Sequence, residues 1–217
     1  MKVSSTVAVA VICAALAACS GTSPVRYTQL QSASQLQPSA NDHSGRVPYD
    51  YSSGADWQKY SSVIVDPVSI YSGVDNQFEK MSEEGKQELA QYMQEQFTDA
   101  LRNKFAIVSA PDARTLLVKL TLTGAKPTKQ FVGTVTKFDL AGGPYNVVQS
   151  IRGKPGMMGG SVSYAVEIYD AFTHQLLSAY VAKQYPNAMN VKATFGALSA
   201  SKTGIKKGAD DLLARLN

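Results

Sequence analysis

Few residues of this chain have side chains suited to catalysis or metal binding. The sequence has two cysteines, Cys13 and Cys19, and two histidines, His43 and His174. His43 lies in a polar stretch that offers no pocket, and we expect His174 to occupy a turn with positive φ. The sequence also lacks the His-Glu-x-x-His, calcium-loop, Gly-x-Ser-x-Gly and phosphate-loop motifs. These observations predict a protein that is not an enzyme and that uses no metal and no cofactor.

Cys19 is the reactive residue whose position is most informative. It follows Met1-Lys2 and an apolar run over 7–18, an arrangement typical of a secretory signal peptide and shorter than the roughly 18–20 residues that span a bilayer. The run ends in Leu16-Ala17-Ala18-Cys19, which resembles the lipobox of bacterial lipoproteins. This resemblance implies a signal peptide over 1–18 and lipidation of Cys19 with fatty acids such as palmitate. The alternative is an ordinary signal peptide that contains a cysteine.

The residue after Cys19 predicts the membrane to which the chain is attached. It is Ser20, whereas an Asp at this position favours retention in the inner membrane of Gram-negative bacteria. We therefore expect an outer-membrane location, with lipid on Cys19 in the membrane and the domain facing the periplasm.

Composition limits the remaining possibilities. The 217 residues are 44% hydrophobic and 18% charged, as in globular proteins, and the net charge of +4 is too small to indicate a nucleic-acid partner. We expect a flexible, lipid-anchored tether over 19–45, which is rich in Ser, Gln and Pro, and a periplasmic domain over 46–217. With both cysteines otherwise committed, this domain should contain no disulfide.

Hydrophobic periodicity predicts the elements of that domain. Apolar residues recur every three or four positions over 83–103 and 199–216, which predicts two helices, the first capped by Ser82. Strands are expected where β-rich or alternating residues occur, at 61–71, 105–108, 116–123, 162–168 and 176–185. This order predicts an α+β fold with one largely antiparallel sheet, or alternatively a mixed one, and two main amphipathic helices packed on a face.

The segment 126–160 is a long insertion between two core strands, rich in Gly and Pro, with one further short strand expected near 131–135. We interpret it as a candidate contact surface for an envelope component, and a merely soluble basic loop is the alternative. The residues of this candidate surface are Lys126, Lys129, Lys137, Arg152, Lys154, Met157 and Met158.

Two stretches resemble a known family. Asp56-Trp57-Gln58-Lys59-Tyr60 followed by an apolar strand ending in Asp66-Pro67-Val68 is similar to the proteobacterial lipoproteins grouped as "domain of unknown function 3313". Asp170-Ala171-Phe172-Thr173-His174-Gln175-Leu176-Leu177 resembles their Asp-x-x-Thr-Gly-Glu-Leu-Leu hairpin, with His-Gln in place of Gly-Glu. The resemblance implies an envelope lipoprotein and no established activity. Trp57 and Tyr60 are expected to be packing anchors.

We therefore expect an outer-membrane lipoprotein whose non-enzymatic periplasmic domain docks an envelope protein. A regulatory or assembly factor for a cell-wall enzyme or a transport machine is the alternative. Asp66 is the one carboxylate expected to be partly buried, as a turn-stabilising group or as a functional acid.

Charge reversal at Arg152 and Lys154 tests the candidate contact surface. The double change to Glu should weaken the contact with the partner or membrane without unfolding the domain, because both residues lie in a predicted loop. Co-purification and thermal unfolding measure the two effects. Unchanged binding would contradict the hypothesis.

Overall fold

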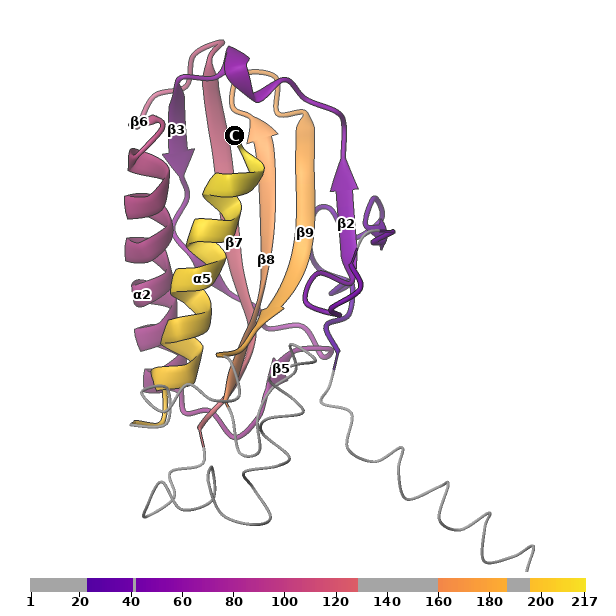
Figure 1. Ribbon diagram of the computed structural model, residues 1–217, viewed down its shortest axis with the longest axis vertical. Coiled ribbons are helices and arrows are strands. Elements are labelled where there is room, and N and C mark those ends of the chain that lie inside the picture. The colour runs from indigo at the N-terminus through magenta and orange to yellow at the C-terminus, as the bar shows by residue number, and fades with distance from the viewer. Residues whose placement is uncertain (1–22, 41, 129–159, 187–195) are drawn as a thin grey trace, which may run out of the picture.

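A computed structural model describes residues 23–40, 42–128, 160–186 and 196–217 (Figure 1). Within these ranges the chain forms one nine-stranded open sheet, and two long helices cover one of its faces. The elements are β1 (Gln37–Pro38), β2 (Tyr49–Ser52), the 3-10 helix η2 (Trp57–Lys59), β3 (Ser62–Val65), β4 (Ser69–Ile70), β5 (Gln77–Phe78), α2 (Glu83–Arg102), β6 (Ala106–Ile107), β7 (Thr115–Lys126), β8 (Ser161–Asp170), β9 (Leu176–Gln184) and α5 (Ser199–Arg215).

The sheet is organised around β7, its longest strand at 12 residues. On one side β7 pairs antiparallel with β8, and the sheet continues through β9 and β2 to β1. On the other side β3, β4 and β5 pair in succession along β7, all parallel to it, and β6 lies beyond β3. The fold is thus α+β with a mixed sheet, as the sequence predicted.

The break between β3 and β4 falls at Asp66-Pro67. Proline has no N–H to donate to a ladder, so pairing stops there and resumes at Ser69. The chain then reaches β5, enters α2 and returns in β6, which pairs parallel with β3. This is the strand–helix–strand unit expected when a helix is flanked by two short strands.

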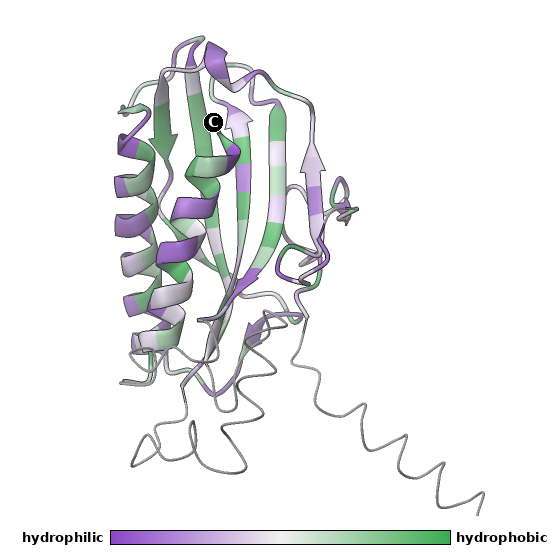
Figure 2. Ribbon diagram, viewed as in Figure 1, coloured by the Kyte–Doolittle hydropathy of each residue, from purple (hydrophilic) through white to green (hydrophobic). Residues whose placement is uncertain are grey.

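The helix α2 is capped by Ser82, as predicted, and the Ser82 hydroxyl accepts the Gly85 N–H at 3.1 Å. Its predicted apolar stripe is buried against the sheet, and Figure 2 shows the alternation of polar and apolar positions along both helices. In α5 the glycines are required for close packing. A Cβ on Gly208 would lie 2.0 Å from Tyr164 Oη, and one on Gly204 would lie 2.9 Å from a Val162 methyl group.

The predicted flexible tether is wrong over its described part, because residues 23–40 pack against the sheet face opposite the helices. Tyr27 and Leu36 are only 1% and 0% exposed. They form a second hydrophobic core with the outward-facing side chains of β8 and β9. No helical or strand period marks this segment, because it follows successive turns and contributes only the two-residue strand β1.

Tyr27 belongs to this second core and is one of the largest fully buried side chains among the described residues. Its ring packs edge-on against Tyr71, with ring centroids 5.2 Å apart. Burial raises the pKa of Tyr27 to about 12. Its backbone has φ 51°, a conformation that costs a non-glycine residue about 1–3 kcal/mol and is maintained by the surrounding packing.

Leu36→Ala tests whether this segment belongs to the folded domain. The change should lower the free energy of unfolding by about 2–5 kcal/mol, the usual cost of a cavity at a fully buried leucine. Ser34→Ala, at an exposed position in the same segment, is the control and should change little. Urea unfolding measures both, and an unaffected Leu36→Ala protein would restore the tether interpretation.

Candidate functional site

The two stretches that resemble the lipoprotein family meet at one end of the sheet. The hydroxyl of Tyr60, just after η2, donates a hydrogen bond of 2.9 Å to Asp170 Oδ2 at the end of β8. The Asp56 side chain accepts the Gln58 N–H at 3.1 Å and so begins η2. Trp57 and Tyr60 also pack, partly buried, against the main core, as expected of packing anchors.

Asp170 organises the turn between β8 and β9. Its Oδ1 accepts the backbone N–H groups of Phe172 at 3.0 Å and Thr173 at 2.8 Å. Its carbonyl oxygen accepts the His174 N–H at 2.9 Å. The φ of His174 is 59°, so the predicted positive φ is confirmed and His174 occupies a position that favours glycine.

The hydrogen bonds also change two pKa values. Partial burial alone would raise the pKa of Asp170, but the N–H groups of Thr173 and Phe172 and the Tyr60 hydroxyl together lower it below 3.8. Desolvation and the hydrogen bond to Asp170 raise the pKa of Tyr60 to about 12. At neutral pH the pair is therefore a phenol that donates to a carboxylate.

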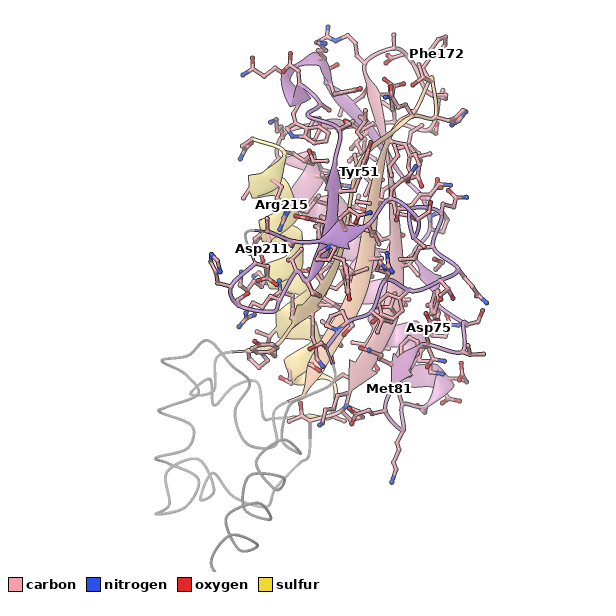
Figure 3. The ribbon with its side chains drawn as sticks, turned by 90° about the vertical axis from the view of Figure 1, so that its right-hand side faces the viewer. Tyr51, Asp75, Met81, Phe172, Asp211 and Arg215 are labelled. Carbon is pink, nitrogen blue, oxygen red and sulfur yellow. The ribbon has the colours of Figure 1, made fainter. Side chains whose placement is uncertain are left out.

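The turn holds Phe172 in solvent, with 67% of its surface exposed (Figure 3). A second exposed apolar residue, Ile107 in the edge strand β6, is 37% exposed. Both lie toward the end of the sheet where β7 begins. We call this end, defined by Tyr60, Ile107, Asp170 and Phe172, the hairpin end.

A hollow of about 320 Å³ lies on the sheet face that carries residues 23–40, and Asp66, Lys119 and Glu167 are among its lining residues. Glu167 is only 4% exposed. Its Oε1 accepts the Ser32 N–H at 2.6 Å and the Tyr169 hydroxyl at 3.4 Å. Glu167 therefore holds residues 23–40 on the sheet. Asp66 is partly buried, as predicted.

A wider groove of about 1160 Å³ lies between the N-terminal ends of α2 and α5. Its rim has mixed charge, with Lys80, Lys202 and Lys206 beside Glu84 and Glu88. Lys202 Nζ lies 2.7 Å from Glu88 Oε1, so part of this charge is already paired.

Of the predicted contact surface, only Lys126 is described. It lies at the end of β7, with its Nζ 3.6 Å from Glu79 Oε2. The predicted strand near 131–135 and the other contact residues lie outside the described residues, as does Cys19. Those residues are Lys129, Lys137, Arg152, Lys154, Met157 and Met158.

Within the described ranges, no three His, Cys, Asp or Glu side chains are grouped as a metal site would require. None of the helices in that part of the chain is long and apolar enough to cross a membrane.

The family model for "Protein of unknown function (DUF3313)" matches residues 26–212. The chain belongs to the DUF3313 family. The match includes both stretches that meet at Tyr60 and Asp170, and most of residues 23–40. No curated protein sequence matches this DUF3313 protein.

Several solved structures are distantly similar to the DUF3313 protein. A PelC dodecamer variant from Paraburkholderia phytofirmans is 11% identical, with 76% of this chain and 95% of that chain covered and a TM-score of 0.40. XCC0632 from Xanthomonas campestris is 7% identical, with 70% and 81% covered and a TM-score of 0.35. A protein from Caulobacter crescentus proposed to be a lipoprotein is 14% identical, with 74% and 88% covered and a TM-score of 0.30. At these TM-scores the similarities carry no inference about function.

Sequence reasoning missed Phe172 and Glu167 as notable residues. An aromatic residue within a predicted turn is a usable signal for Phe172. The burial of Glu167 could not be predicted, because nothing in the sequence shows that residues 23–40 cover the face of the strand that carries it.

Asp170→Asn tests the turn through the pH dependence of stability. Because the folded pKa of Asp170 lies below its unfolded value, its contribution is present above pH 3.8 and is lost as the pH falls through the folded pKa. The variant should therefore be less stable than the parent at pH 7, and the difference should shrink below pH 3.8. Asp210→Asn, at an exposed position of α5, is the control. Urea unfolding at several pH values measures the difference in free energy of unfolding between parent and variant. A difference that did not change with pH would contradict the role of Asp170.

Proposed function

We propose that this DUF3313 protein is a non-enzymatic lipoprotein of the outer membrane, anchored through lipid on Cys19, whose periplasmic domain docks an envelope protein through the hairpin end. The observation that carries this proposal is the exposure of Phe172 on a turn whose backbone is hydrogen-bonded to Asp170. Phe172 is 67% exposed, yet the N–H groups of Phe172 and Thr173 are fixed by Asp170.

Hydrogen bonding of the turn matters because ordering flexible side chains and loops costs free energy on binding. The turn at Phe172 is held by Asp170, which is held in turn by Tyr60. The backbone of this turn therefore needs little further ordering when a partner covers the Phe172 ring. Aromatic residues at the buried centre of a protein interface often supply much of its binding energy.

The edge strand β6 lies at the same end and adds a second kind of contact. Ala106 and Ile107 are exposed on the outermost strand beyond β3. At two residues this edge is too short to pair extensively with another strand, which also protects it from aggregation. The partner is therefore expected to bind mainly through an apolar pocket that receives Phe172.

Phe172→Ala should weaken binding of the partner by about 2 kcal/mol or more, the loss typical of a central aromatic residue. Stability should change little because the ring is exposed. Site-specific photocrosslinking from position 172 in cells identifies the partner, and binding of the purified partner to both proteins measures the loss. Crosslinking from Gln91, exposed on α2, is the matched control.

An adduct that forms from position 172, is absent from position 91 and is lost in Cys19→Ala supports docking by the anchored protein. Identical adducts from both positions, or none from 172, would contradict docking through the hairpin end. A change in the turnover of a captured enzyme would favour the regulatory alternative.

A further inference from the structure

The chain that leads to Cys19 enters the domain at the end opposite Phe172. The carbonyl oxygen of Ser23 accepts the Gln77 side-chain N–H at 2.9 Å. Gln77 pairs with Gly124 near the end of β7, whereas Asp170 pairs with Leu116 near its start. These two levels of β7 are separated by about 26 Å, at 3.3 Å per residue. Figure 3 accordingly shows Phe172 at one end, with Asp75 and Met81 toward the other.

Covalent geometry limits the distance from Cys19 to the domain. Four residue steps separate Cys19 from Ser23, so their Cα atoms are at most about 14 Å apart. A lipid on Cys19 would therefore keep Ser23 and its neighbours close to the membrane surface. The packing of residues 23–40 removes the long spacer that a tether would have provided.

Exposed apolar side chains lie beside this entry point. Val74 is 100% exposed and Val25 is 38% exposed. The loop that carries Val74 is ordered, since Asp75 Oδ2 accepts the Thr28 N–H at 3.0 Å and Asp75 Oδ1 accepts the Tyr71 hydroxyl at 2.6 Å. Val74 is thus held in solvent next to the segment that carries Val25, and no described residue covers it.

The charges at this end are of both signs. Asp75 accepts hydrogen bonds from Thr28 and Tyr71 and keeps its negative charge, and Glu79 lies near Lys126. Lys80, by contrast, is exposed and forms no ion pair within the described part of the chain. Both long helices also begin toward this end, and the amide ends of helices favour negative groups.

We infer that the end of the domain formed by Val25, Val74 and Lys80, the valine end, rests against the phospholipid surface that holds Cys19. Val74 lies at the boundary between headgroups and acyl chains, and Lys80 lies among the phosphates. This inference rests on the proposed lipidation of Cys19. It adds a second membrane contact to the lipid and fixes the domain end-on, with Phe172 pointing away.

Depth-dependent quenching tests the orientation. In the mature protein, the one native cysteine would carry lipid, so a single free thiol can be introduced for labelling. The variants are Val74→Cys, Gln91→Cys and Phe172→Cys, each labelled with a fluorophore. Each lipidated variant is reconstituted in phosphatidylethanolamine–phosphatidylglycerol vesicles that contain a lipid with a nitroxide near its headgroup. We expect quenching at position 74 to be severalfold stronger than at 91 or 172, and to persist in high salt because the contact is mainly apolar.

Each outcome decides a separate point. Equal quenching at 74 and 91 means that the domain lies on its side, and stronger quenching at 172 means that it is inverted; either result overturns the inference. Absence of quenching at 74, in protein that floats with the vesicles, also overturns it. Protein that fails to float, like its Cys19→Ala control, contradicts the proposed lipidation instead.

Discussion

The burial of β7 on both faces is the constraint on which the rest of the structure depends. Its residues that point toward the helices, including Leu116, Leu120 and Leu122, are 0–1% exposed. On the other face Thr121 and Thr123 are also buried, at 9% and 0% exposure. A strand covered on both sides needs a layer on each, and the helices supply only one. Residues 23–40 supply part of the other.

This second layer explains several features together. Glu167 can be buried in the middle of β8 because the Ser32 N–H lies 2.6 Å from its Oε1. Tyr27 can adopt a costly backbone conformation because its ring fills the second core. The same layer brings the start of the described chain to the end of the sheet opposite the turn between β8 and β9, which carries Phe172.

Regular apolar spacing in the sequence predicted the helices and strands. Contacts made by single residues without regular spacing were missed. The helix from Glu83 and the alternating strand from Thr115 follow from repeated apolar spacing, and the turn at His174 follows from the Asp and Thr before it. Residues 23–40 follow successive turns, and the side chains that they bury are not regularly spaced. A short stretch of sequence therefore does not show that they pack against the sheet. In the site, the Asp170 turn was foreseeable as local chemistry. Its bond to Tyr60 joins positions 110 residues apart, and no local pattern encodes such a contact.

The way residues 23–40 are attached also determines how the domain would bear tension on its N-terminal chain. The bonds met along the chain include Ser23 with Gln77, Thr28 with Asp75, and Ser32 with Glu167. They follow one another in sequence, so a pull from the membrane would load them in series and break them one at a time. Each break would release a short length of chain before the next bond was strained. Under tension the segment would thus lengthen in steps before the force reached the main core.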